Sequence, residues 1–222
     1  MGIKRVVDEI LCRVSPEYHQ SRQLSAFIEE VFIRQEYYFL VEALRPDTTV
    51  IDIGAAFGET SIYFAQFKDV KKVYGYEPNT IAFRHMLEYV KVLPFSEKIS
   101  PSQVAIMDKD SSIKVGKEVI VLQEIKSSKK GVEIPVCSLA TILIDKKNVV
   151  IKCDCEGEEY KIFKELSKEV LKECYKIQIE FHRGVRDLQE VLSVCGFETK
   201  IEFKSDSNFG VNSLGYIYGW RA

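Results

Sequence analysis

The alternation of strand-like and helix-like segments constrains the fold of this chain more than any other feature. Residues Thr49 to Ile53 form a β-branched run that ends at Gly54, as buried strands do, and a helical pattern follows from Gly58 to about Phe67. The same order repeats at once, with strand residues 73–76 and helix residues 80–92. Such alternation is typical of parallel β-α-β units, in which helices cover both faces of one sheet.

The rest of the chain continues this alternation. Further strands are expected near Gln103–Ile106, Val149–Cys153, Tyr175–Phe181, Glu198–Phe203 and Leu214–Trp220, and further helices over Glu158–Leu171 and Val185–Cys195. The pattern predicts an α/β fold with a doubly wound, mostly parallel, seven-stranded sheet. Between Asp108 and Pro135, short alternating segments separated by polar turns predict a hairpin insertion with a mobile tip.

The first 45 residues follow a helical pattern instead. Two apolar stripes have helical spacing, one formed by Val6, Val7, Ile10, Leu11 and Val14 and the other by Leu24, Phe27, Ile28, Val31 and Phe32. Arg45, Pro46 and Asp47 interrupt the pattern just before the first strand. We therefore predict an N-terminal helical cap over residues 1–45 and the main α/β domain over residues 46–222.

Charge and cysteine content indicate which class of partner and which cellular compartment to expect. The 31 Lys and Arg nearly cancel the 33 Asp and Glu, so no overall field attracts nucleic acid or an anionic membrane. The N-terminus scatters charges among its apolar residues, which neither a signal-peptide core nor a membrane-spanning helix tolerates. Six cysteines without a C-x-x-C pair predict reduced thiols and no zinc site. We expect a cytoplasmic protein whose partner is a small molecule.

The segment VIDIGAAFGET, Val50 to Thr60, carries the strongest local signal for a ligand. A strand runs into a tight turn with Gly54 and Gly58, and a helix begins there, while Asp52 lies at the carboxyl end of the strand. The two glycines are expected to let the backbone turn and to let a ligand approach closely. Both dinucleotides and S-adenosylmethionine (SAM) bind at turns of this kind.

The spacing of the turn favours SAM over a dinucleotide. In a G-x-G-x-x-G fingerprint that starts at Gly54, the second and third glycines fall on Ala56 and Glu59. A pyrophosphate beside the carboxylate of Glu59 loses much of the attraction that a helix N-terminus supplies. SAM has no phosphate and carries a cationic sulfonium, so an acidic turn is compatible with it.

Glu77 ends the next strand, in VYGYEPN, about twenty residues after the turn. An acidic side chain at this place can accept hydrogen bonds from ribose hydroxyls. Asp52 and Glu77 have an alternative interpretation as helix-capping or solvated carboxylates. Their occurrence at the ends of two adjacent predicted strands favours a ligand site.

Four motifs in this order resemble the FkbM-type methyltransferase family. The matching residues are Asp52, Gly54, Ala55 and Gly58; Glu77, Pro78 and Asn79; Lys152, Asp154, Glu156, Gly157 and Glu159; and Glu180 with His182. The resemblance implies a seven-stranded, Rossmann-like SAM-dependent methyltransferase fold, usually acting on a hydroxyl of a sugar or natural product. It implies SAM as cofactor and a small-molecule or glycan acceptor. Donor contacts are predicted from Asp52, Gly54, Ala55, Gly58, Glu77, Pro78 and Asn79.

The acceptor side is predicted at the ends of two later strands. Lys152, Asp154 and Glu156 alternate with Cys153 and Cys155, so their side chains share one face while the strand continues. The same alternation groups Gln178, Glu180 and His182. Unpaired charges are costly to bury in apolar strands, so these side chains are expected to emerge at the ligand-binding edge.

We predict that Asp154, Glu156, Glu180 and His182 form the catalytic group. Asp154 or His182 is expected to take the proton from an acceptor hydroxyl while its oxygen attacks the methyl carbon. Two alternatives remain open for these residues, a structural ion-pair network with Lys152 and a site for a divalent cation such as Mg²⁺ or Mn²⁺. For the whole chain the alternatives are an NAD-linked oxidoreductase and a non-catalytic SAM-binding module.

Overall fold

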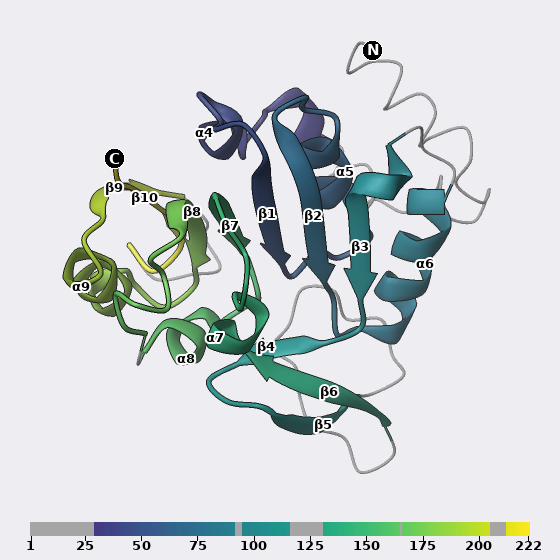
Figure 1. Cartoon of the computed structure of the whole chain (residues 1–222). Helices are drawn as coiled ribbons and strands as arrows, with labels where there is room; N and C mark the ends of the chain where they lie inside the picture. The colour runs from purple at the N-terminus through teal and green to yellow at the C-terminus, as the bar shows by residue number, and fades with distance from the viewer. Residues whose placement is uncertain (1–28, 92–94, 116–130, 165, 205–211) are drawn as a thin grey trace.

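The computed structural model describes residues 29–91, 95–115, 131–164, 166–204 and 212–222, and its centre is one large β-sheet (Figure 1). In the described residues this sheet has seven strands in the order β3-β2-β1-β7-β8-β10-β9. The strands are β1 (Thr48–Ile53), β2 (Val70–Tyr76), β3 (Ile99–Ser102), β7 (Val149–Cys153), β8 (Cys174–Phe181), β9 (Glu198–Phe203) and β10 (Gly215–Trp220). The predicted fold class is confirmed, because β10 alone runs antiparallel to its neighbours β8 and β9.

The parallel strands end at one common edge of the sheet. Figure 1 shows the arrowheads of β1, β2 and β3 pointing the same way, and β7 pairs in parallel with β1 on its other side. All six residues of β1 are buried, as expected for a central strand covered on both faces. Side chains that follow β1, β2, β7 and β8 therefore meet at this carboxyl edge.

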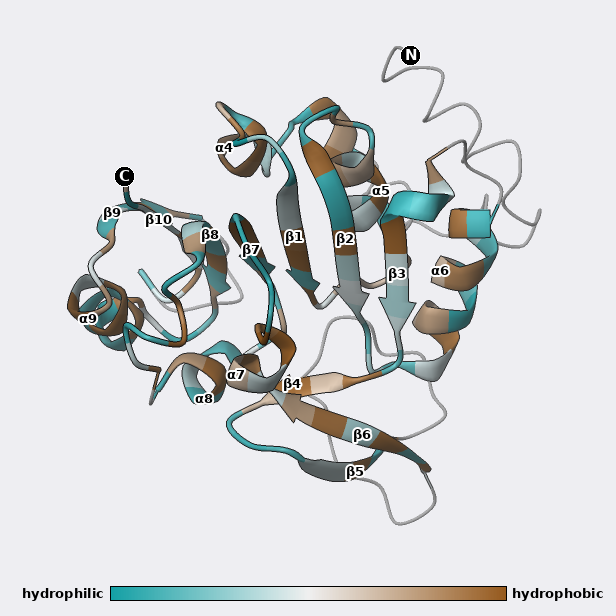
Figure 2. Ribbon diagram, viewed as in Figure 1, coloured by the Kyte–Doolittle hydropathy of each residue, from teal (hydrophilic) through white to brown (hydrophobic). Residues whose placement is uncertain are grey.

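Helices cover both faces of the sheet, and β1 supplies core residues to each side. Val50 packs into a hydrophobic cluster with α5 (Glu59–Ala65) and α6 (Thr80–Lys91). Ile51, the next residue, packs into a second cluster with α8 (Glu159–Phe163) and α9 (Arg186–Val194). Hydrophobic and hydrophilic residues alternate along α6 and α9 in Figure 2, as they do in helices with one buried side. Among the described helices, none has both the length and the apolar character that a bilayer crossing requires.

A second, three-stranded sheet lies below the carboxyl edge of the large sheet (Figure 1). Its strands are β4 (Ala105–Met107), β5 (Ser111–Val115) and β6 (Val132–Ser138), in the order β4-β6-β5. The antiparallel pair β5 and β6 confirms the predicted hairpin insertion, whose expected tip lies outside the described residues. The short helix α7 (Leu139–Ile142) connects this sheet to β7.

The described part of the N-terminal segment is less helical than predicted. It contains a π-helix, η1 (Glu29–Ile33), and one turn of α-helix, α4 (Tyr38–Val41), and residues 34–37 between them are not helical. Phe32 and Leu40 are nevertheless buried in the core cluster that contains α5. Residues 1–28, which hold the first predicted stripe and most of the second, lie outside the described residues. The division at residues 45 and 46 stays a prediction.

Two predicted elements differ from those observed. The strand predicted near Gln103–Ile106 is misplaced, because β3 of the large sheet already ends at Ser102 and the next strand, β4, belongs to the small sheet and begins at Ala105. The helix predicted over Glu158–Leu171 ends at Phe163, and turns follow it. The Ser167 hydroxyl accepts a hydrogen bond from the backbone N–H of Val170, and such local bonds compete with helical ones.

Candidate active site

The turn after β1 is built by residues with left-handed backbone angles. Gly54 has a φ of +74° and Gly58, which caps α5, a φ of +94°. A Cβ on Gly54 would lie 1.7 Å from the carbonyl oxygen of Asp154, and one on Gly58 would lie 2.8 Å from Cγ of Met86. Both positions therefore require glycine because of the turn and because other parts of the protein approach closely. The sequence predicted that a ligand approaches these glycines closely. In the structure, the atoms that lie closest to the two Cβ positions are protein atoms, of Asp154 and Met86.

Asp52 is fully buried at the end of β1 and holds the first turn of α5. Its Oδ2 accepts hydrogen bonds of 2.6 Å from the hydroxyls of both Thr60 and Ser61. Its Oδ1 lies 3.4 Å from Nζ of Lys152. The carboxylate of this predicted donor residue is thus enclosed by protein groups.

Lys152 on β7 connects the turn after β1 to both neighbouring carboxylates. Its buried Nζ donates to the carbonyl oxygen of Gly54 (2.6 Å) and lies 4.0 Å from Oδ2 of Asp154. Burial alone would lower the pKa of Lys152, but the charges of Asp52 and Asp154 raise it above its ordinary value. Lys152 therefore remains a cation inside the site.

Glu77 lies just after β2 and reaches back to the turn after β1. Its Oε2 accepts from the backbone N–H of Ala56 (2.9 Å) and its Oε1 from that of Asn79 (2.7 Å). Burial raises the pKa of Glu77 to about 7, although these N–H donors act in the opposite direction. A carboxylate has about four acceptor sites, so roughly two remain for other donors.

The other predicted donor residues near Glu77 have contacts inside the protein. Asn79 caps α6, because its Oδ1 accepts from the backbone N–H groups of Ile81 (2.9 Å) and Ala82 (3.1 Å). Ala55 is fully buried and donates its N–H to the carbonyl oxygen of Tyr76 (3.1 Å). The carbonyl oxygen of Pro78 accepts from the side chain of Gln103 (3.4 Å).

A further buried carboxyl group stands in the first turn of α5. Glu59 is 4% exposed, and its Oε1 has no hydrogen-bond partner. Burial raises the pKa of Glu59 to about 8. With Asp52 and Glu77, it makes the ends of β1 and β2 rich in acidic groups.

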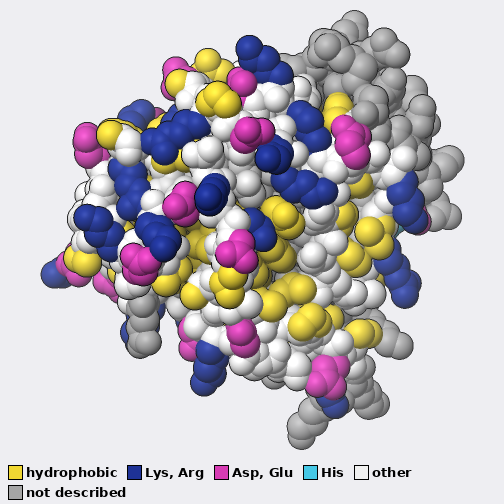
Figure 3. All heavy atoms as spheres, viewed as in Figure 1, with side chains coloured by type: hydrophobic (Ala, Val, Ile, Leu, Met, Phe, Trp, Pro, Cys, Tyr) yellow, Lys and Arg dark blue, Asp and Glu magenta, His cyan; other side chains and the backbone are white. Residues whose placement is uncertain are grey.

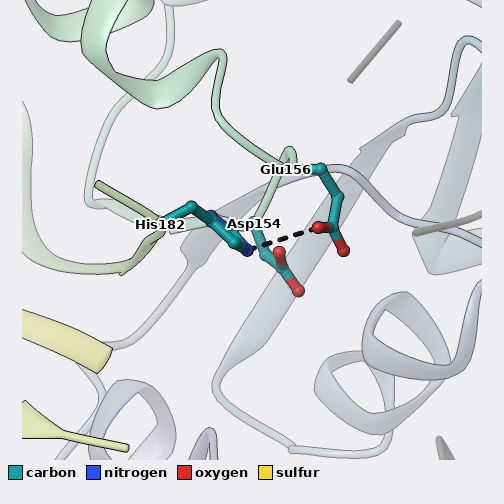
Figure 4. Close-up of side chains that lie close together, drawn as sticks. All are labelled: Asp154, Glu156 and His182. Atoms are coloured by element: carbon teal, nitrogen blue, oxygen red, sulfur yellow. Dashed lines mark ion pairs between the residues drawn. The ribbon is translucent and has the colours of Figure 1, made fainter. Parts of the chain in front are cut away.

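Asp154, Glu156 and His182 come together after β7 and β8, as predicted (Figure 4). One ligand atom from each lies within 4.8 Å of the others, and Nε2 of His182 is 3.4 Å from Oε2 of Glu156. On the other side of the ring, Nδ1 lies 3.1 Å from Oε1 of the fully buried Glu159. The same Glu159 oxygen accepts from the backbone N–H of His182, so it fixes both the ring and the chain.

Glu180 does not join these three side chains. Its Oε1 accepts from Nζ of Lys204 (3.0 Å), which also pairs with Glu36 (3.3 Å) and Glu30 (3.5 Å). The hydroxyl of Tyr216 donates to Oε2 of Glu36 (2.5 Å) and lies beside the same Lys204. Burial raises the pKa of Glu180 to about 8. In the described structure this predicted catalytic residue attaches the N-terminal segment to the sheet.

Two residues have larger roles in the site than the sequence indicated. Lys152 and Glu159 belong to the motif K-x-D-x-E-G-x-E, but neither was predicted as a donor or catalytic residue. Lys152 bridges the turn after β1 and Asp154, and Glu159 orients His182. The signal that could have identified them is burial, because a Lys and a Glu in apolar surroundings need partners.

Comparisons with known proteins identify the family of this chain. The model of a family described as the methyltransferase FkbM domain matches residues 52–199, a segment that includes every predicted site residue. A comparison with curated proteins gives no match.

The crystal structure of a methyltransferase FkbM from Methylobacillus flagellatus KT is similar to this fold, with a TM-score of 0.55 and 17% sequence identity. That match covers 98% of this chain but 58% of the other, so this chain spans under two thirds of its length. M. capricolum TrmK in complex with S-adenosyl-homocysteine gives a TM-score of 0.48 at 12% identity and covers 84% of this chain and 67% of that one. Since the family model matches more than half of the residues, the chain belongs to the FkbM methyltransferase domain family.

Proposed function

We propose that this protein is a SAM-dependent O-methyltransferase that acts on a hydroxyl of a sugar or a small natural product. The observation that carries the proposal is the position of Glu77, whose buried carboxylate follows β2 and bonds to the turn after β1. This is the place where dinucleotide and SAM proteins hold a ribose, and Glu77 retains acceptor capacity for its hydroxyls. Membership of a methyltransferase family supports the same function.

The charge of the donor side fits SAM. Asp52, Glu59 and Glu77 surround the turn, and Lys152 is already paired with Asp52. SAM supplies a methyl group on a cationic sulfonium, whose charge would favour the ionised forms of Glu59 and Glu77, whereas the pyrophosphate of a dinucleotide would oppose them.

The acceptor hydroxyl belongs beside Asp154, Glu156 and His182. The carbonyl oxygen of Asp154 contacts Gly54, so this group adjoins the donor turn. Glu159 holds Nδ1 of His182, which leaves Nε2 on the side of Asp154 and Glu156. Proton removal by Asp154 or His182 would contribute about 10²- to 10⁴-fold, and alignment of the reactants up to roughly 7–11 kcal/mol.

The assignment of donor is tested by ligand-induced thermal shifts. SAM and its demethylated product are expected to raise the melting temperature, and NAD is expected to leave it unchanged. Glu77→Gln should weaken SAM binding by about tenfold, since it removes a charged acceptor worth about 1.5 kcal/mol. Glu133→Gln, on the exposed side of β6, is the matched control. Stabilisation by NAD in place of SAM would favour the oxidoreductase alternative.

Transfer is tested with a panel of sugar and small-molecule hydroxyls in single-turnover reactions followed by mass spectrometry. Asp154→Asn and His182→Ala are expected to slow methylation while SAM binding persists. Undiminished rates in both variants would remove the proposed base. A protein that binds SAM but methylates no hydroxyl of the panel would favour the non-catalytic binding module.

The remaining properties follow from charge and from the cysteines. On the face drawn in Figure 3, basic and acidic side chains are interspersed, which supports a small-molecule or glycan acceptor over nucleic acid or a membrane. The five described cysteines are free thiols, which supports a cytoplasmic location.

A further inference from the structure

We propose that Asp154, Glu156 and His182 bind a divalent cation at the acceptor side of the site. Glu180 is not part of this set, because its carboxylate pairs with Lys204. The binding itself is independent of methyl transfer. Its role, holding the acceptor oxygen, rests on the function proposed above.

The three ligand atoms are close enough for one ion. They lie within 4.8 Å of one another, and Nε2 of His182 is 3.4 Å from Oε2 of Glu156. Metal–ligand bonds of about 2.1 Å place two ligands about 3.0 Å apart when adjacent and about 4.2 Å apart when opposite. Small side-chain rotations therefore suffice. The ligands come from two neighbouring strand ends, so the sheet fixes their spacing (Figure 4).

His182 is oriented as metal-binding histidines are. In such sites, one ring nitrogen binds the metal and the other donates to a carboxylate, which sets the tautomer and the ring plane. Here Glu159 is fully buried and accepts from Nδ1, and Nε2 faces Glu156. After β7, which supplies the other two ligands, Oδ1 of Asp154 is buried and has no hydrogen-bond partner. A cation would satisfy this oxygen.

The local charges also favour a cation. Asp154, Glu156 and Glu159 contribute three carboxylates around one imidazole. Lys152 is 4.0 Å from Asp154, but it lies closer to Asp52, at 3.4 Å, and is shared between the two. A dication would offset the excess negative charge, which is costly in a half-buried site.

The ligand set indicates the chemistry of the ion. Two carboxylates and one imidazole suit a hard divalent cation such as Mn²⁺ or Mg²⁺, and a six-coordinate ion keeps positions open for an acceptor oxygen. The ion would polarise the acceptor hydroxyl. The oxygen then forms its bond to the methyl carbon, the sulfur keeps the electron pair of the bond that breaks, and the proton passes to the second carboxylate oxygen of Asp154. With Nε2 of His182 on the metal, Asp154 is the proton acceptor.

The experiment measures Mn²⁺ binding to the full chain after treatment with a chelator, by electron paramagnetic resonance of free Mn²⁺, without SAM or acceptor. Binding is expected to saturate at one equivalent. Asp154→Asn and His182→Ala should each weaken it at least tenfold, and Glu159→Gln by about 10- to 100-fold through loss of orientation. His85→Ala is the matched control, because His85 also lies beside a carboxylate, Glu88, at 3.6 Å. Circular dichroism establishes that each variant is folded.

The proposal is overturned if the wild-type protein binds no Mn²⁺ at about 1 mM, the weak end of protein sites for such ions, or if the variants bind as tightly as the wild type. SAM binding by the chelated protein, measured in parallel, separates this result from a failure of the proposed function. A protein that binds SAM but no Mn²⁺ loses only the metal site. One that binds Mn²⁺ at these residues but not SAM loses only the assigned donor.

Discussion

Asp52 on β1 and Lys152 on β7 form an ion pair of 3.4 Å across two neighbouring strands, with both side chains almost fully removed from solvent. Removing one partner of such a pair leaves an uncompensated buried charge. Lys152→Met should therefore lower the free energy of unfolding by about 3–5 kcal/mol, measured by urea denaturation. The double variant Asp52→Asn with Lys152→Met removes both charges and should lose less than Lys152→Met alone. An equal or larger loss in the double variant would contradict this account.

Gly54 should tolerate substitution by alanine much less than Gly184, although both glycines have a positive φ. Gly54→Ala combines a positive φ with a collision against the carbonyl oxygen of Asp154 at 1.7 Å. Gly184 also has a positive φ, +94°, but nothing lies within 4 Å of the added atom, so Gly184→Ala carries the conformational cost alone. That cost is about 1–2 kcal/mol. Thermal unfolding should show Gly54→Ala to be the less stable variant by several degrees, and equal melting temperatures would exclude the collision.

Glu59 should make stability depend on pH. Its pKa is raised from 4.5 to about 8 by burial, so the folded protein keeps a proton that the unfolded chain releases. Because the folded state binds more protons between these values, the free energy of unfolding falls as pH rises from 4.5 to about 8. Glu59→Gln removes this titration. It should be more stable than the wild type at pH 8 by a few kcal/mol, at about 1.4 kcal/mol per pKa unit, with a smaller difference near pH 4.5. Urea denaturation at both pH values measures this, and parallel pH curves would argue against it.

Lys204 should hold the N-terminal segment on the sheet. Its Nζ contacts the carboxylates of Glu30, Glu36 and Glu180, which would repel one another without it. In Lys204→Met, hydrogen exchange should accelerate in residues 29–41 and remain slow in β1. The control Lys200→Met removes an exposed pair with Glu202 and should leave exchange in this segment unchanged. Unchanged exchange in Lys204→Met would show that apolar contacts alone hold the segment.

The alternation of strands and helices was sufficient to predict the large sheet. The strands β1, β2, β7 and β8 lie where their apolar runs predicted them, because buried parallel strands need such runs. The strands β9 and β10 were also predicted near their observed positions, although they pair antiparallel and β9 is mostly exposed. The edge strand β3 was misplaced. Pro101 interrupts its pattern, and proline is tolerated there because β3 is an edge strand, paired with β2, among the strands that the structure describes.

The sequence predicted where the site residues lie in the fold better than it predicted which side chains they contact. Asp154, Glu156 and His182 meet because they follow the ends of the neighbouring parallel strands β7 and β8, and the sequence pattern predicts these ends. The partner of Glu180 was not predictable, because Lys204 follows a different strand and Glu36 lies in the N-terminal segment. Contacts between segments so distant in sequence depend on how the N-terminal segment packs against the sheet, and local sequence patterns do not predict this packing.

Because the Asp154 carbonyl packs against Gly54, the turn after β1 and the loop after β7 cannot move independently of each other. A backbone shift near Asp154 that accommodates a bulkier molecule at the proposed acceptor side should therefore also displace the turn after β1. A chimera that takes only one of these two loops from a relative would lose the fit between Gly54 and the Asp154 carbonyl. Redesign of the proposed acceptor specificity should therefore change the turn after β1 and the loop after β7 together.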